Sequence, residues 1–182
     1  SKDMDSTSLD YAPERNAVPA EFKGPGKIAV HVPKLPFAAD EEMNRLGINI
    51  NFSGEHMKAV MVTSSIAHEG KSSISVNLWK KLAEAGAKTV LVDLDMRNTA
   101  LRTSLDYQFH GDDYKGIDFY LSGHAKYEDV VYETNIDNGY IVPCTNTMFN
   151  PMSLLQDASL SRIINKLKED FDIVHIVDLL AG

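Results

Sequence analysis

Residues 59–73 read AVMVTSSIAHEGKSS, in which an apolar run leads through a polar loop into a Gly-Lys-Ser tripeptide. The run Ala59–Thr63 is short, apolar and β-branched, which predicts a strand buried on both faces. Apolar residues then recur at helical spacing, so a helix is predicted over residues 71–85 with Gly86 as its C-terminal cap. A polar loop between a buried strand and a helix is where a phosphate-binding loop is found.

The residues of this loop have the chemistry that phosphate binding needs. Gly70 lets the backbone wrap around phosphate oxygens, Lys71 can reach the β- and γ-phosphates, and Ser72 can place a hydroxyl on Mg²⁺. The helix start adds N–H groups and a partial positive charge. For the tripeptide alone, a surface turn that caps a helix is the alternative. The residues predicted to contact the nucleotide are Ser65, His68, Glu69, Gly70, Lys71, Ser72 and Ser73.

Carboxylates stand at the ends of two further apolar runs. Asp93 and Asp95 follow one run, and Asp178 follows the other. In an open α/β sheet, ligands bind at the carboxyl ends of the strands. Residues two apart on an extended chain point the same way, so Asp93 and Asp95 can reach one cation. The alternative for Asp93 and Asp95 is a solvated turn, and the alternative for Asp178 is an ordinary Asp at the end of a strand. The predicted metal ligands are Ser72, Asp93, Asp95 and Asp178.

The order of the predicted elements indicates an α/β fold. Buried strands separated by helical crossovers imply a parallel sheet with helices on both faces. The remaining predicted elements are strands over residues 89–92, 140–142 and 171–177 and a helix over residues 160–169.

Two regions of the chain differ in composition. Residues 1–38 are rich in Ser, Asp, Glu, Pro and Gly, and they are predicted to form an extended arm, in which a short strand over residues 28–32 is an option. A helix is predicted to begin at Asp40. Residues 39–182 are predicted to form one nucleotide-binding domain.

Charge and cysteine content limit the function classes. The 182 residues carry 18 Lys and Arg against 26 Asp and Glu, a formal net charge of -8, which argues against binding to nucleic acid. The single cysteine, Cys144, excludes an internal disulfide and a Cys-rich zinc site, and it favours a reducing, cytoplasmic setting. No apolar run approaches the ~20 residues that a membrane span needs.

Together these motifs resemble the bacterial tyrosine kinases (BY-kinases) that control capsule and exopolysaccharide synthesis. Ser64–Ser72 is similar to the Walker A loop of that family, and Val90–Arg97 is similar to its second Walker motif, called A′. Gly116–Gly123 resembles a family segment that opens a short helix, and Asn150–Leu155 resembles a family Asn-Pro-x-x-Leu-Leu turn. Asp178 then stands where the family has its Walker B acid.

The resemblance implies ATP and Mg²⁺ as cofactors and transfer of the γ-phosphate of ATP to tyrosine. The catalytic residues that it implies are Lys71, Asp93 and Asp95, of which one Asp accepts the tyrosine proton. It further implies ring-like self-association and a transmembrane activator or polysaccharide co-polymerase, separate or fused. The protein would then work in the cytoplasm at the inner face of the membrane. The sequence does not decide which Asp is the base.

Several residues depart from the family pattern. His68 stands where the family has a small residue, and a solvent-facing role is the alternative for it. Glu42 and Arg45 match the self-association motif, but Ile48 stands at its last position, so the oligomeric state stays open. Relatives continue through further strands and a tyrosine cluster past the position of Asp178, so a sheet truncated on its C-terminal side is an option. The seven tyrosines of this chain are scattered and are expected to be packing or surface residues.

Two other functions are alternatives to kinase activity. The chain could be a nucleotide-binding regulatory module without catalytic activity, which would switch a membrane partner. It could also be a ParA- or MinD-like ATPase, although the extra loop lysine of those proteins would fall at Ile66.

Overall fold

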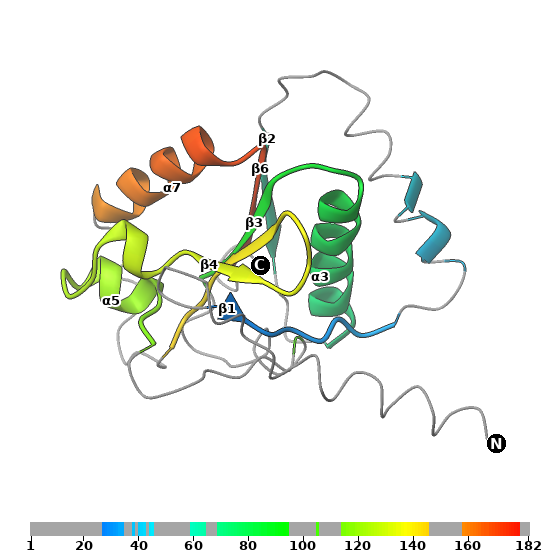
Figure 1. The fold of residues 1–182 in the computed structure, drawn as a ribbon, viewed down its shortest axis with the longest axis horizontal. Helices are drawn as coiled ribbons and strands as arrows, with labels where there is room; N and C mark the ends of the chain where they lie inside the picture. The colour runs from blue at the N-terminus through cyan, green and yellow to red at the C-terminus, as the bar shows by residue number, and fades with distance from the viewer. Residues whose placement is uncertain are drawn as a thin grey trace.

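The computed structural model describes residues 27–34, 38, 40–42, 44–45, 59–64, 69–94, 105, 114–145 and 158–178. Within these ranges six strands form one sheet in the order β1-β4-β5-β3-β6-β2 (Figure 1). The strands are β1 (Lys27–Ile28), β2 (Ala59–Ser64), β3 (Thr89–Asp93), β4 (Tyr132–Thr134), β5 (Gly139–Val142) and β6 (Ile173–Asp178). The four strands predicted from apolar runs are therefore confirmed as β2, β3, β5 and β6.

The helices whose bounds the structure gives are α3 (Glu69–Glu84), α5 (Ile117–Leu121), the 3-10 helix η2 (Tyr127–Asp129) and α7 (Ala158–Asp170). The helices predicted over residues 71–85 and 160–169 are confirmed as α3 and α7. Gly86 has a φ of 101°, which a side chain would strain, and it ends α3 as predicted. Helix α3 begins two residues before the predicted start, so Gly70 and Lys71 lie inside its first turn.

Four neighbouring strands of the sheet are parallel, as predicted. β3 pairs with both β5 and β6, and β6 pairs with β2, each time in parallel. β4 was not predicted, and it pairs with β5 antiparallel. The hydroxyl of Thr134 closes this hairpin, because it donates to the Gly139 carbonyl at 2.7 Å and accepts from the Ile136 N–H at 3.1 Å.

Alternate residues of the central strands pack on opposite faces of the sheet. Val90 and Val92 belong to the cluster that packs under α5 and α7, whereas Leu91 belongs to the cluster under α3. Trp79 of α3 is fully buried, and its indole N–H donates to the Tyr140 carbonyl at 3.1 Å. Helices thus cover both faces (Figure 1), which confirms the predicted α/β architecture.

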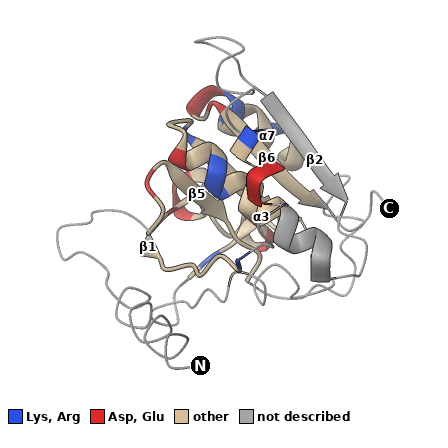
Figure 2. Ribbon diagram, turned by 90° about the vertical axis from the view of Figure 1, so that its right-hand side faces the viewer, with Lys and Arg blue, Asp and Glu red and all other residues tan. Residues whose placement is uncertain are grey.

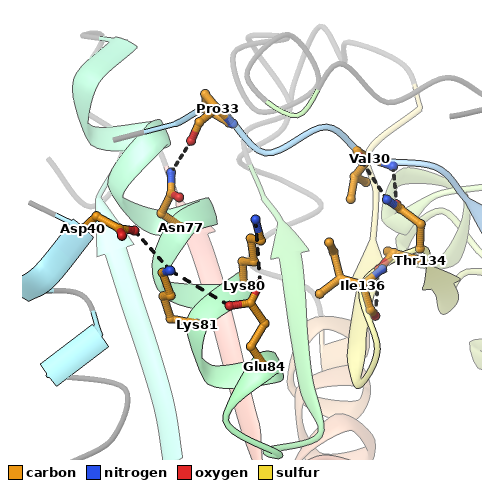
Figure 3. Close-up of polar contacts among 10 residues, drawn as sticks. Val30, Pro33, Asp40, Asn77, Lys80, Lys81, Glu84, Thr134 and Ile136 are labelled. Carbon is orange, nitrogen blue, oxygen red and sulfur yellow. Dashed lines mark hydrogen bonds and ion pairs between the residues drawn. The ribbon is translucent and has the colours of Figure 1, made fainter. Parts of the chain in front are cut away.

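The segment of residues 27–34 lies along α3 and the β4–β5 hairpin, and we call it the strap. Its β1 strand pairs with β4. A short strand is therefore present here as the sequence allowed, but it begins one residue earlier and ends at Ile28, before most of the predicted range of residues 28–32. The side chain of Asn135 accepts from the Val30 N–H at 2.7 Å and donates to the Val30 carbonyl at 3.1 Å. Asn77 of α3 donates to the Pro33 carbonyl at 2.8 Å (Figure 3). The domain boundary between residues 38 and 39 stays a prediction.

Candidate functional site

Three strands that end at or lead into predicted site residues have their carboxyl ends at one edge of the sheet. Ser64 ends β2 and pairs with Asp178, which ends β6. Asp93 ends β3 and pairs with Val177 of the same β6 strand, and the ladder continues with the Leu94 N–H donating to the Val177 carbonyl at 2.9 Å. The carboxyl ends of β2, β6 and β3 therefore lie side by side, with Asp178 between the other two strands.

The start of α3 lies at this same edge. β2 ends at Ser64 and α3 begins at Glu69, so only four residues connect them. The short connection keeps the first turn of α3, which contains Gly70, Lys71 and Ser72, next to the strand ends. A helix start has N–H groups without intrahelical partners and a partial positive charge, which favour an anion. Ser73 lies in this turn region as well, whereas Ser65 and His68 lie outside the described residues.

Asp93 is the one predicted carboxylate whose side chain the structure describes. It is buried, with 2% of its surface exposed, and it follows the fully buried residues Leu91 and Val92. Asp95 lies outside the described residues, and of Asp178 the structure describes the backbone. Among the described side chains no group of three His, Cys, Asp or Glu residues is arranged to hold a metal ion. The predicted metal set thus stays a prediction.

His175 is a buried histidine in the middle of β6. It pairs in register with Met61 on one side and Leu91 on the other, and none of its surface is exposed. Burial disfavours the charged imidazolium and lowers the pKa of His175 to about 4. At neutral pH this histidine is an uncharged residue of the core.

Two of the described tyrosines, Tyr132 and Tyr127, are anchored by short hydrogen bonds of their hydroxyl groups. The hydroxyl of the buried Tyr132 donates to the Lys115 carbonyl at 2.7 Å, and burial raises the pKa of this phenol to about 12. The Tyr127 hydroxyl donates to the Asp170 carboxylate at 2.7 Å, and burial, together with that bond, raises the pKa of Tyr127. Tyr11 and Tyr107 lie outside the described residues.

The start of the predicted helix at Asp40 is helical over residues 40–42 and 44–45. Glu42 and Arg45, one turn apart, form an exposed ion pair at 3.3 Å. Ile48 and the segment Asn150–Leu155 lie outside the described residues.

Sequence reasoning missed a polar contact at the same carboxyl edge, between Asp118 of α5 and Thr145, which follows β5. Asp118 is buried, with 3% of its surface exposed, and it accepts hydrogen bonds from both the N–H and the hydroxyl of Thr145. The two residues are 27 positions apart, so no local pattern reveals the contact. The one signal is a charged residue within the otherwise apolar segment Ile117–Leu121.

No helix in the described ranges is both long enough and apolar enough to cross a membrane.

Comparison with known proteins defines the class of this fold. A family model described as AAA domain matches residues 57–179. The VpsO kinase domain matches with a TM-score of 0.62 and 26% identity, covering 80% of this chain and 70% of that structure. The septum site-determining protein MinD of Pyrococcus horikoshii, solved with Mg-ADP, matches with a TM-score of 0.54 and 28% identity, covering 66% of this chain and 48% of that one. The fold is that of P-loop nucleotide-binding proteins.

The tyrosine-protein kinase CpsD of Streptococcus agalactiae is 39% identical over 137 residues, which are 75% of this chain and 58% of that kinase. The chain therefore belongs to the AAA-domain family, and the predicted resemblance to the bacterial tyrosine kinases is confirmed. The chain spans less than two thirds of the length of this relative.

Proposed function

We propose that the chain is the ATP-binding domain of a bacterial protein-tyrosine kinase that regulates the synthesis and export of capsular polysaccharide or exopolysaccharide. The observation that carries the proposal is the meeting of the α3 start with the ends of β6 and β3 at one sheet edge. A phosphate-binding helix start next to strand-end carboxylates is the arrangement that phosphoryl transfer uses. The 39% identity to a tyrosine-protein kinase supports the same activity.

The first turn of α3 holds the β- and γ-phosphates of ATP in this proposal. Its N–H groups and the Lys71 ammonium neutralise the charge that develops on the transferred phosphoryl group. The loop residues Ser65, His68, Glu69, Gly70 and Ser73 complete the phosphate contacts.

The donor set Ser72, Asp93, Asp95 and Asp178 consists of hydroxyl and carboxylate oxygens, which are the hard ligands that Mg²⁺ prefers. Bound there, Mg²⁺ supplies further charge neutralisation at the phosphates. Asp93 or Asp95 accepts the proton of the acceptor tyrosine hydroxyl. Of these two carboxylates, Asp93 is the one that the structure describes, and it is buried at the end of β3.

The proposed partners follow from the resemblance to BY-kinases. They are a transmembrane activator or polysaccharide co-polymerase, separate or fused, and further copies of this chain. The protein works in the cytoplasm at the inner face of the cell membrane. Nucleic acid is not proposed as a partner, because the net charge is -8 and acidic residues are interspersed with basic ones over the described elements (Figure 2).

The proposal is tested by incubating the chain with ATP, Mg²⁺ and a Glu-Tyr copolymer, and by measuring phosphotyrosine with mass spectrometry. Lys71→Met is the control, because it removes the ammonium and keeps a side chain of similar length. We expect phosphotyrosine with the wild-type chain and at least about 100-fold less with the variant, as for the loss of one strong electrostatic contact to the transition state. Equal phosphotyrosine in both would refute kinase activity, and Mg-ADP binding without any transfer would favour the regulatory module instead.

A further inference from the structure

The contact between Asp118 and Thr145 joins the start of α5 to the segment that leaves β5. The Thr145 N–H donates to Asp118 Oδ1 at 2.9 Å, and the Thr145 hydroxyl lies 3.0 Å from Oδ1 and 2.9 Å from Oδ2. Hydrogen bonds to an ionised carboxylate are stronger than neutral ones, and a buried carboxylate needs them. Both donors of Thr145 are thus committed to Asp118.

Backbone contacts reinforce the same junction. The Ile117 N–H donates to the Pro143 carbonyl at 2.7 Å. A Cβ on Gly116 would collide with that carbonyl oxygen, and it would lie 2.9 Å from the Thr145 nitrogen. Residue 116 therefore has no room for a side chain where it lies against residues 143–145.

This junction lies beside the candidate site. β5 pairs with β3, and Val142 is opposite Val92, so Pro143 follows β5 where Asp93 follows Val92. β2, which leads into the phosphate loop, lies on the other side of β3, beyond β6. Residues 143–145 thus border the Asp93 end of the site on the side away from the phosphate loop.

We propose that Asp118 is a positioning residue for phosphoryl transfer, which holds Pro143–Thr145 as a fixed wall where the acceptor tyrosine approaches. The inference rests on the proposed kinase function, since it assigns a side of that site to the acceptor. One carboxylate holds this wall through two donors of Thr145. Replacing either Asp118 or Thr145 is therefore expected to let residues 143–145 move. Binding of the nucleotide, on the other side of β3, does not depend on it.

Cys144 provides a direct readout of the wall. It is the only cysteine in the sequence, it stands between Pro143 and Thr145, and it is buried under α5 and α7 with 8% of its surface exposed. Its rate of reaction with a thiol reagent such as DTNB therefore reports how often residues 143–145 leave their position.

The variants are Asp118→Asn and Thr145→Val, with Thr145→Ser expected to restore wild-type behaviour because it keeps both donors. Thr134→Val is the matched control, since that hydroxyl bonds the Gly139 carbonyl at the opposite end of β5. We expect Cys144 to react about 10-fold faster in Asp118→Asn and Thr145→Val, as for the loss of a hydrogen bond to a charged group. Thr134→Val and Thr145→Ser should stay within about 2-fold of the wild type.

Enzyme kinetics test the role of the wall. In Asp118→Asn and Thr145→Val we expect kcat/KM for the tyrosine acceptor to fall about 10-fold or more, while the Kd for Mg-ADP changes less than about 2-fold. A parallel loss of ADP affinity, or unchanged Cys144 rates and acceptor kinetics, would overturn the inference. If the wild-type chain transferred no phosphate, both the proposed function and the acceptor role would be overturned. The Cys144 rates do not depend on phosphotransfer, so they would still show whether the Asp118–Thr145 contact holds residues 143–145 in place.

Discussion

Gly116 has an ordinary φ of −116°, so the reason for a glycine there is space and not backbone conformation. A Cβ would meet backbone atoms of Pro143 and Thr145 and an oxygen of Asp118. Backbone atoms move only when the whole segment moves, so the added methyl group cannot be accommodated by a rotamer change.

We therefore predict that Gly116→Ala lowers the free energy of unfolding by about 1–3 kcal/mol, the range for overpacking. Urea denaturation followed by circular dichroism measures the change. Gly123→Ala is the comparison. Gly123 has open space around it but a φ of 83°, so the free-energy cost of that substitution comes from backbone conformation alone. If the Gly116→Ala variant were as stable as the wild type, the packing described here would be contradicted.

His175 makes stability depend on pH. Its folded-state pKa is about 4 and the ordinary value is 6.5, so the unfolded chain binds the proton more tightly. The stability that the neutral buried form contributes is therefore present above pH 6.5 and is lost as the pH falls toward 4.

The loss amounts to roughly 3 kcal/mol over that window at 1.4 kcal/mol for each pH unit. Urea denaturation at several pH values measures it, with His175→Gln as the variant that removes this titration. We expect the variant to show a flatter decline between pH 6.5 and 4 than the wild type. Parallel curves would mean that His175 does not carry the effect.

At the scale of elements, helix α3 contacts the helical segment that begins at Asp40. Lys81 of α3 pairs with Asp40 at 3.1 Å and with Glu84 at 4.0 Å, whereas among the described residues its neighbour Lys80 pairs with Glu84 alone, at 3.7 Å (Figure 3). The two lysines are adjacent in sequence, so they make a matched pair of positions for substitution.

We predict that Lys81→Ala increases amide hydrogen exchange in residues 40–45 about 3-fold or more, because it removes their ion pair to α3, while Lys80→Ala leaves it unchanged. Ion pairs of partly exposed groups contribute up to about 1 kcal/mol, which sets this magnitude. Exchange monitored by mass spectrometry gives the comparison. Equal exchange in the two variants would show that the ion pair with Lys81 does not stabilise the backbone around Asp40.

Elements differed in how well the sequence predicted them. The strands β2, β3, β5 and β6 are runs of mostly apolar residues, and such runs are easily identified in a sequence. The three residues of β4 are too few to show alternation, and their pairing depends on Thr134 closing a turn with Gly139. The Asp118–Thr145 contact was equally invisible, because it joins residues that only the folded sheet brings together.

At the scale of the whole molecule, the candidate site depends on three strand ends and one helix start meeting at a single edge. Sequence reasoning predicted this meeting from the rule that parallel strands present their carboxyl ends together, and the register of β2, β6 and β3 confirms it. The side-chain arrangement around the ligand could not be predicted in the same way, since it depends on the loops between those elements.

The central claim is that this edge binds a nucleotide, and a thermal melt with Mg-ADP tests it most directly. A ligand at about 100 times its Kd stabilises a fold by about 2.7 kcal/mol, which raises the Tm of a domain of this size by several degrees. We predict such a rise for the wild-type chain and a much smaller one for Lys71→Met. A melting curve of the wild type that millimolar Mg-ADP leaves unchanged would contradict the account.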